Sequence, residues 1–197
     1  MEHYFTKKPT SKLVEHTVHF IALGHTVALT SASGVFSATR FDDGAALLIN
    51  TAQFEANEKV LDLGCGFGTV GILLKMHYPK INMVMTDINE RAVFCSIKNA
   101  KKYHLDIDIR QSDGFDALKD VCFDVILFNP PQTAGKKLCL DLIVKCKDHL
   151  LKGGRLLMVA RHNKGGKSLS EFVFEIFGNM EELSKSKGYR VYVSKNI

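Results

Sequence analysis

Short apolar runs alternate with longer amphipathic segments after residue 55. The short runs are rich in β-branched and aromatic residues, whereas apolar residues recur at helical spacing in the longer segments. This alternation predicts βαβ units, and right-handed crossovers then favour a doubly wound, Rossmann-like, mostly parallel α/β sheet. The predicted strands are Lys59–Leu63, Asn82–Thr86, Ile107–Arg110, Phe123–Phe128 and Arg155–Ala160, and the predicted helices lie near Val70–His77, Glu90–Tyr103, Lys136–Leu151 and Ser168–Phe177.

The N-terminal part has a different pattern. Two β-rich runs, Val18–Leu23 and Thr26–Thr30, flank Gly24-His25, which predicts a small β-hairpin. The apolar segment Ala45–Phe54 follows Asp42-Asp43-Gly44 and predicts a helix with an acidic start. A hairpin and a helix therefore precede the sheet.

The C-terminal runs, Met180–Lys185 and Tyr189–Ser194, predict an antiparallel hairpin that closes the sheet. We expect residues 1–197 to form one domain, in which an N-terminal extension (1–55) precedes the α/β core (56–197). If the substrate is a macromolecule, the surface that holds the ligand must then also recognise that substrate.

Composition excludes several classes of protein. The chain has 197 residues, 46% of them hydrophobic and 24% charged, which suits one folded domain. No stretch approaches the roughly 20 apolar residues of a membrane span, and the N-terminal segment lacks the apolar centre of a signal peptide. The five cysteines are an odd number without a CxxC pair, which argues against disulfides and a closed zinc site. We therefore expect a cytoplasmic protein with no membrane partner and no metal.

A glycine-rich segment follows the first core strand. Gly64, Gly66 and Gly68 alternate with other residues between Lys59–Leu63 and the next predicted helix. Glycines there let a ligand approach the backbone N–H groups, although a tight turn without a ligand gives the same pattern. The spacing G-x-G-x-G differs from the dinucleotide fingerprint, and the lysine and hydroxyl of a P-loop are missing. The segment predicts a nucleoside ligand without a pyrophosphate.

Acidic residues end the next two predicted strands. Asp87 follows Asn82–Thr86, and Asp113 lies in Gln111–Gly114 after Ile107–Arg110. The Asp87 carboxylate can accept hydrogen bonds from both hydroxyls of a ribose, unless it caps the following helix. Asp113 can accept from an adenine amino group. Because the carboxyl ends of parallel strands share one edge, these groups and the glycines should meet, and S-adenosylmethionine fits them.

The third chemical element is Asn129-Pro130-Pro131, directly after the predicted strand Phe123–Phe128. A rigid carboxamide oxygen and a neighbouring backbone carbonyl can accept both hydrogens of an exocyclic amine. Two such acceptors stabilise the positive charge that develops on the nitrogen as a methyl group arrives. The prolines fix the carbonyl and remove competing donors, although adjacent prolines can also simply end a strand.

Together these motifs resemble the class I S-adenosylmethionine-dependent methyltransferases. The segments Gly34-Val-Phe-Ser37 and Phe41-Asp-Asp-Gly44, with Gly188-Tyr-Arg-Val191 near the end, are similar to the methyltransferase small domain subgroup. That subgroup includes the catalytic halves of ribosomal RNA guanine-N2 methyltransferases and compact stand-alone relatives. The resemblance runs from about His19 to Ser194.

The resemblance implies a role for each matched residue. The glycines would pass beneath the methionine part of the cofactor, Asp87 would hold the ribose and Asp113 would lie near the adenine. Phe36 would belong to a segment that closes over the site. The resemblance assigns catalysis to Asn129, Pro130 and Pro131, substrate binding to Phe36 and Gln132, and cofactor binding to Asp62, Gly64, Cys65, Gly66, Gly68, Asp87, Ile88, Ser112, Asp113, Gly114 and Asn129.

Gln132 departs from part of the wider family. Enzymes that methylate adenine or protein glutamine usually carry an aromatic residue here, which stacks on the planar target. Gln132 cannot stack in that way, which favours the guanine-directed subgroup. Phe36 or Phe128 could supply the stacking face instead.

The excess positive charge lies in the predicted core. The net charge of the chain is +5. Residues 1–55 contain 4 basic and 5 acidic residues, whereas residues 56–197 contain 22 basic and 16 acidic residues. Mild basicity is compatible with a nucleic-acid partner and does not establish one. The basic residues that could form a rim near the site are Lys101, Lys102, Lys136, Lys137, Lys145, Lys147, Arg161, Lys164 and Lys167.

The leading hypothesis is an S-adenosylmethionine-dependent N-methyltransferase that acts on an exocyclic amine of a nucleobase, with guanine N2 in ribosomal RNA as the favoured target. One alternative is methylation of a protein amide or a small-molecule amine by the same groups. Another is a non-catalytic module that binds the cofactor or RNA.

Overall fold

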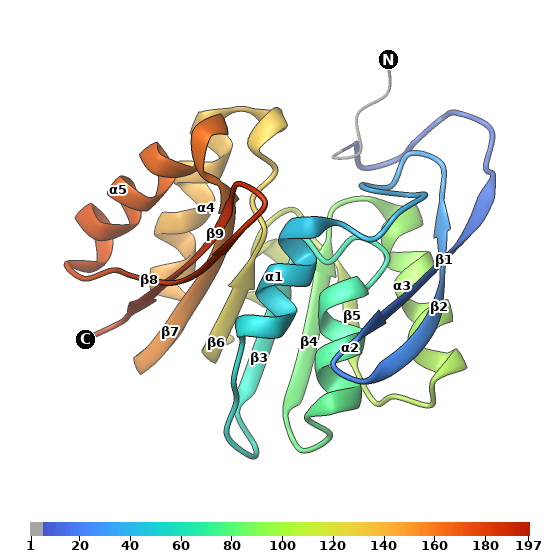
Figure 1. The fold of residues 1–197 in the computed structure, drawn as a ribbon, viewed down its shortest axis with the longest axis horizontal. Helices are drawn as coiled ribbons and strands as arrows, with labels where there is room; N and C mark the ends of the chain where they lie inside the picture. The colour runs from blue at the N-terminus through green and yellow to red at the C-terminus, as the bar shows by residue number, and fades with distance from the viewer. Residues whose placement is uncertain (1–5) are drawn as a thin grey trace.

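The structure is a computed structural model that describes residues 6–197, so the first five residues of the predicted N-terminal extension lie outside it. The main sheet consists of β3 (Lys59–Leu63), β4 (Asn82–Asp87), β5 (Asp108–Gln111), β6 (Phe123–Phe128), β7 (Leu150–Arg161), β8 (Glu181–Ser186) and β9 (Tyr189–Lys195). Their order is β5-β4-β3-β6-β7-β9-β8 (Figure 1). The first five in this order are parallel, whereas β9 is antiparallel to both neighbours. The predicted Rossmann-like sheet with a C-terminal antiparallel hairpin is confirmed.

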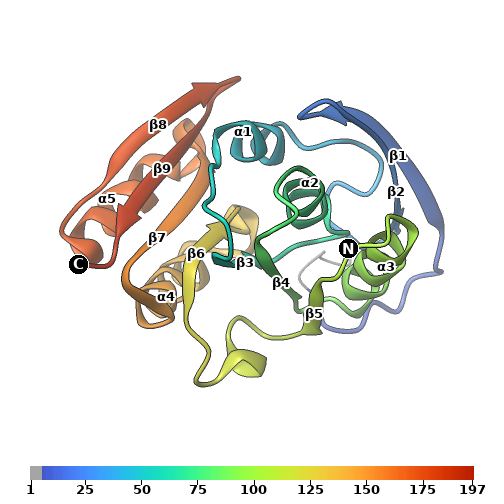
Figure 2. The same cartoon turned by 90° about the horizontal axis from the view of Figure 1, so that it is seen from below.

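Five α-helices cover the two faces of this sheet within the described residues. One side carries α1 (Asp43–Thr51), α2 (Thr69–His77) and α3 (Glu90–Lys102), and the other carries α4 (Lys136–Asp148) and α5 (Gly166–Phe177) (Figure 2). The buried apolar residues form two clusters, one on each side. Burial on both faces explains why most residues of β3 and β6 are apolar; β3 is interrupted by Asp62, which is itself buried, and β6 is continuously apolar from Val125 to Phe128.

The N-terminal hairpin packs against α3. Its strands are β1 (Glu15–Ala22) and β2 (His25–Ala32). The backbone N–H of Ala28 donates to the hydroxyl oxygen of Tyr103, the C-cap residue of α3, at 2.8 Å. Because Ala22 pairs with His25, the turn is Leu23-Gly24, both with positive φ. The predicted turn at Gly24-His25 is therefore wrong by one residue.

Two predicted helix ends differ from the structure. α1 begins at Asp43 because the Asp42 side chain accepts from Ala45 N at 2.8 Å, and it ends before the predicted Phe54. α4 ends before the predicted Leu151, because β7 already begins at Leu150, opposite Phe123. The pairing register between β6 and β7 shifts after this first pair, between Phe123 and Val125. The residues of β7 before the shift have no alternating pattern of hydrophobic residues that would predict a strand.

The four strands that matter for chemistry end together. Leu63 is paired with both Thr86 and Phe128, and Asp87 is paired with Gln111. The segments that follow β3, β4, β5 and β6 therefore emerge side by side. The sheet order reverses between β3 and β6, which is where open α/β sheets bind ligands.

Candidate active site

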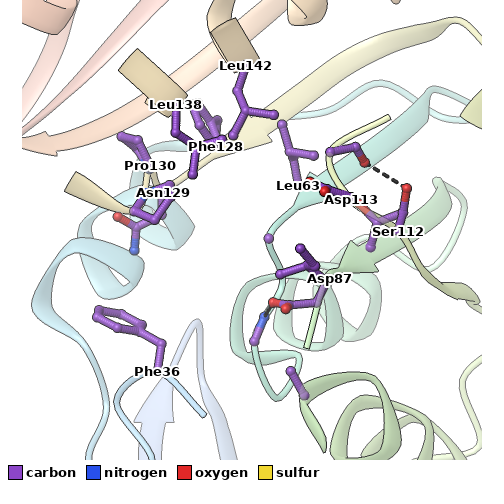
Figure 3. A pocket seen from close by; sticks show the side chains of 17 residues that line it. Phe36, Leu63, Asp87, Ser112, Asp113, Phe128, Asn129, Pro130, Leu138 and Leu142 are labelled. Atoms are coloured by element: carbon purple, nitrogen blue, oxygen red, sulfur yellow. Dashed lines mark hydrogen bonds between the residues drawn. The ribbon is translucent and has the colours of Figure 1, made fainter. Parts of the chain in front are cut away.

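A cavity of about 320 Å³ lies over this edge of the sheet (Figure 3). Phe36 and Asn129 lie on one side of it, and Asp87 and Ser112 lie on the other. The site therefore combines residues from four strand ends with a segment that precedes α1. The lining residues are Phe36, Leu63, Gly64, Gly66, Thr86, Asp87, Ile88, Ala92, Ser112, Asp113, Gly114, Phe128, Asn129, Pro130, Pro131, Leu138 and Leu142.

The glycine loop is held by β4. Gly64 N and Cys65 N donate to the Thr86 carbonyl oxygen at 2.8 and 2.9 Å, and Gly66 N donates to Asp87 Oδ2 at 2.8 Å. A Cβ built on Gly64 or Gly66 would meet no atom within 4 Å. Since both glycines line the cavity, they leave room for a ligand against the backbone.

Gly68 has a structural role and does not line the cavity. Its φ is +91°, and a Cβ there would lie 2.7 Å from Ile72 Cδ1 and 3.1 Å from Ser96 Oγ. We expect Gly68→Ala to lower the free energy of unfolding by about 2–4 kcal/mol, through left-handed strain and overpacking. Gly178 also has positive φ but open space around it, so Gly178→Ala should cost only about 1 kcal/mol. Equal losses in urea denaturation would contradict the packing role of Gly68.

Asp62 and Cys65, both predicted to bind the cofactor, lie beneath the loop and do not line the cavity. Asp62 Oδ2 accepts from Gly71 N at 2.9 Å. Burial raises the Asp62 pKa to about 7; the Gly71 bond opposes this shift and the charge of Asp87 adds to it. Burial likewise raises the pKa of the Cys65 thiol, whose sulfur lies 3.6 Å from Ser96 Oγ. Both side chains support the loop from below.

Asp87 is placed to hold a polar ligand. Its Oδ1 accepts from Asn89 N and its Oδ2 from Gly66 N, both at 2.8 Å, which fixes the carboxylate at the cavity. Burial raises its pKa, and these N–H groups oppose the shift. Asn89, whose side chain accepts from Arg91 N and Ala92 N, caps α3, so the alternative role of Asp87 as the helix cap is wrong.

The predicted adenine segment lines the far end of the cavity. Ser112 N donates to the Asp87 carbonyl oxygen at 2.9 Å, and Ser112 Oγ donates to the Gly114 carbonyl oxygen at 2.9 Å. Leu142 of α4 closes this end, because a Cβ on Gly114 would lie 2.9 Å from its Cδ2. Leu138 and Leu142 were missed in the sequence, although their spacing of four residues places them on one helix face.

Asn129 is oriented by a residue 87 positions earlier. Its Nδ2 donates to Asp42 Oδ1 at 3.3 Å, and the same oxygen accepts from Ala45 N at the start of α1. Because a carboxylate oxygen accepts and the amide nitrogen donates, this contact leaves the Asn129 carboxamide oxygen to accept another hydrogen bond. The sequence places Asp42 at an acidic helix start and in the family-like segment Phe41-Asp-Asp-Gly44, but it does not predict this contact with Asn129.

The segment after Asn129 is a rigid turn. The Pro130 carbonyl oxygen accepts from Gln132 N at 2.8 Å, which leaves one lone pair for a second donor. The Gln132 side chain accepts from Arg161 N and donates to the Lys164 carbonyl oxygen, both at 3.0 Å. It does not line the cavity, so the structure places Gln132 as a tie between loops and not in the predicted substrate-binding position.

Phe36 projects from a segment tied to α3. Asn89 Nδ2 donates to the Gly34 carbonyl oxygen at 2.8 Å, and Arg91 donates to the Ser33 carbonyl oxygen at 3.0 Å. Phe36 is 41% exposed and lies on the same side of the cavity as Asn129 (Figure 3), whereas Phe128 is 1% exposed. Of the two aromatic residues predicted as stacking faces, Phe36 alone is accessible.

The basic residues predicted as one rim separate in the fold. Some lie in the last turns of α3 and α4, at the sheet edge opposite the cavity, and others lie at the cavity edge. The prediction of a single rim is therefore wrong. Lys101, Lys102, Lys145 and Lys147 belong to the opposite edge. At the cavity edge, Lys136 and Lys137 begin α4, Arg161 ends β7, and Lys164 and Lys167 follow β7.

Several other chemistries find no support in residues 6–197. No three His, Cys, Asp or Glu side chains gather there in a way that could hold a metal ion. The five cysteines are free, and four of them are buried. None of the helices in this range is long and apolar enough to cross a bilayer.

The lining residues fit S-adenosylmethionine. Gly64 and Gly66 provide a cradle that a Cβ would fill, and the Asp87 carboxylate at its centre suits ribose hydroxyls. The apolar side chains of Leu63 and Leu142 border the end near Ser112 and suit the faces of an adenine ring.

Comparison with known proteins agrees with this geometry. Residues 26–193 match the methyltransferase small domain family. The chain is 35% identical to the uncharacterized protein YbxB of Bacillus subtilis, over all of this chain and 99% of that protein. It is 33% identical to ribosomal RNA small subunit methyltransferase C of Haemophilus influenzae, over 86% of this chain and 52% of that protein.

A solved structure supports the same fold. The T. thermophilus 16S rRNA N2 methyltransferase RsmC, in complex with AdoMet and guanosine, superimposes with a TM-score of 0.82 at 22% identity. The match covers 96% of this chain and 52% of that one, so the chain spans about half the length of these ribosomal RNA methyltransferases. Because the family model matches residues 26–193 and a relative is 35% identical over nearly its whole length, the chain belongs to the methyltransferase small domain family of class I S-adenosylmethionine-dependent methyltransferases.

Proposed function

We propose that this methyltransferase transfers the methyl group to an exocyclic amine of a nucleobase, with guanine N2 in ribosomal RNA as its target. The observation that carries the proposal is the contact between Asp42 Oδ1 and Asn129 Nδ2. It occupies the Asn129 amide nitrogen and so presents the carboxamide oxygen as the acceptor for an N–H donor. A planar exocyclic amine has two such hydrogens, and the Pro130 carbonyl oxygen is the second acceptor.

Residues on one side of the cavity hold the cofactor, and residues on the other side position the target amine. When bound, S-adenosylmethionine supplies a methyl group on a positively charged sulfur. Asp87 and the glycine loop hold the cofactor, and Asn129 with Pro130 positions the amine. Their oxygens also stabilise the charge that develops on its nitrogen. Phe36 provides a face on which a flipped base can stack.

The choice of ribosomal RNA rests on the relatives. Ribosomal RNA small subunit methyltransferase C of H. influenzae matches over 86% of this chain, and the structurally similar RsmC carries guanosine in its complex. Gln132 supports a guanine over an adenine target, because no aromatic side chain follows Asn129-Pro130-Pro131. The chemistry of the acceptors supports an exocyclic amine, and the names of the relatives support guanine in ribosomal RNA.

Asp42 should act as a positioning residue. Asp42→Ala is expected to lower kcat by about 10- to 100-fold, the equivalent of one lost buried hydrogen bond, and to lower stability by about 1 kcal/mol through loss of the α1 cap. Asp42→Ser keeps a helix-capping oxygen and should recover the stability but not the activity. Asp42→Asn retains an acceptor for Asn129 and should recover both. A parallel loss of stability and activity in all three variants would contradict the positioning role.

The substrate class can be tested with labelled cofactor. Wild-type protein and S-adenosylmethionine with a tritiated methyl group are incubated separately with total RNA, protein and metabolite fractions. We expect label in RNA. Label found only in protein or only in metabolites would overturn the RNA proposal and support one of the alternative amine or amide substrates.

A further inference from the structure

A second hollow lies beside the active site, on the side away from the glycine loop. It has a volume of about 340 Å³, and it is lined by His162, Asn163 and the β8–β9 turn, residues 185–190. Figure 1 shows this turn next to the start of α1 and the loop that precedes α4. We call the cationic side chains around it the basic rim. Lys185, Lys187 and Arg190 line the hollow. Arg161 lies over the Tyr189 ring, Lys164 directly follows the lining residue Asn163, and Arg40 lies three residues before Asp43, the partner of Lys187.

The basic rim is physically joined to the amine site. Lys187 Nζ lies 2.7 Å from Asp43 Oδ1. Asp43 directly follows Asp42, the residue that orients Asn129. A Cβ on Gly44 would lie 2.9 Å from the Tyr189 ring, so the start of α1 is pressed against β9. The basic rim therefore adjoins the side of the cavity that Asn129 lines.

The loop after β7 is hydrogen-bonded both to Gln132, next to Asn129-Pro130-Pro131, and to the β8–β9 turn. The Gln132 side chain binds the backbone of Arg161 and Lys164, and His162 N donates to the Gly188 carbonyl oxygen at 2.9 Å. The Arg161 guanidinium also lies over the Tyr189 ring, 5.5 Å from its centre. These ties hold the cations in a fixed relation to Asn129-Pro130-Pro131. They also give the Gln132 side chain a role, which is to connect the catalytic loop with the rim.

The rim carries more positive than negative charge. Asp43 pairs with Lys187 and Glu182 pairs with Arg190. Across the part of the chain that the structure describes, no carboxylate lies within ion-pair distance of the other four rim cations. These four are exposed: Arg40, Arg161, Lys164 and Lys185. Uncompensated cations beside a site attract an anionic ligand, and arginine and lysine are the usual partners of phosphate.

We propose that the basic rim binds the phosphate backbone of the RNA strand whose target base enters the cavity at Asn129. This inference rests on the proposed function and names the surface through which RNA is held. A base that leaves its stack brings its flanking phosphates to the mouth of the pocket, and backbone contacts there set the register of the strand. Such contacts are sequence-independent and give a binding constant that falls steeply with salt.

The test compares two variants that each lose three positive charges. In the rim variant Arg161, Lys164 and Lys185 are replaced by glutamine. In the control variant Lys80, Lys101 and Lys152, which are exposed near the opposite edge of the sheet, are replaced by glutamine. Calorimetric affinity for S-adenosylmethionine and the thermal unfolding midpoint establish that both variants are folded.

Binding of a fluorescently labelled single-stranded oligoribonucleotide is measured by anisotropy between about 50 and about 200 mM salt. The rim variant should bind at least about tenfold more weakly at low salt, and its slope of log affinity against log salt should be shallower by about 2, because each lost contact removes about 0.7. The control variant should keep the wild-type slope. Equal slopes for the two variants, or no RNA binding by the wild type, would overturn the inference.

The labelled-methyl assay separates this inference from the proposed function. If wild type methylates RNA and the rim variant does so with unchanged KM, the rim is not the phosphate surface and the proposed function stands. If wild type labels only protein, the proposed function fails. A rise in KM for RNA in the rim variant alone, at unchanged S-adenosylmethionine affinity, supports both.

Discussion

Replacing Asn129 by alanine is expected to lower kcat for methyl transfer to RNA by about 10²–10³-fold. The contact between Asn129 Nδ2 and Asp42 leaves the Asn129 carboxamide oxygen to accept, and in the proposed function this oxygen is one of two acceptors for the target amine. Removing it leaves the developing charge on the amine nitrogen with one acceptor only. The affinity for S-adenosylmethionine should fall far less than kcat, because the glycine loop and Asp87, which make the main expected contacts with the cofactor, remain.

Single-turnover transfer of labelled methyl with saturating RNA measures this effect on the chemical step. Asn82→Ala, at the opposite end of the β4 strand, is a matched control and should react at the wild-type rate. A rate for Asn129→Ala within a few-fold of wild type would show that Asn129 does not contact the reacting amine.

Replacing Asp87 by alanine is expected to weaken S-adenosylmethionine binding by at least about 100-fold. The carboxylate can accept two hydroxyl hydrogen bonds, each of about 1.5–3 kcal/mol because the acceptor is charged. It also holds Gly66 N and Asn89 N, so its loss loosens the cradle itself. Both effects act on the cofactor and should leave RNA affinity in the absence of cofactor unchanged.

Isothermal titration calorimetry of the Asp87 variants gives the dissociation constant directly. Asp87→Asn keeps one acceptor oxygen and should lie between wild type and Asp87→Ala. Glu90→Ala, which removes an exposed carboxylate from the first turn of α3, three residues after Asp87, should bind normally. Undiminished binding by Asp87→Ala would place the ribose elsewhere.

The core of the fold could be predicted because its signals are local. β3 and β6 begin and end at the predicted residues, since a strand buried on both faces is an apolar run of defined length. The end of α4 could not be predicted. Leu150 and Leu151 continue a helical apolar pattern, and only pairing with Phe123 makes them part of a strand.

In the site, too, some residues follow from local sequence patterns, whereas others are revealed only by contacts in the folded chain. The residues that line the cavity from strand ends, such as Gly64, Asp87 and Asn129, were predicted because the strand order brings those ends together. The contact between Asp42 and Asn129 joins positions 87 apart, and no local pattern encodes it. Gln132 was assigned to the substrate, yet its partners on the loop after β7 are visible only in the folded chain.

The most direct test of the central claim is the identity of the methylated atom. RNA is incubated with wild-type protein and S-adenosylmethionine whose methyl group is deuterated, and the RNA is then digested to nucleosides for mass spectrometry. The two-acceptor geometry at Asn129 and Pro130 predicts a deuterated methyl group on an exocyclic amine, with N2-methylguanosine as the product. A label on a ring carbon or on a ribose oxygen, or RNA that carries no label, would contradict the account.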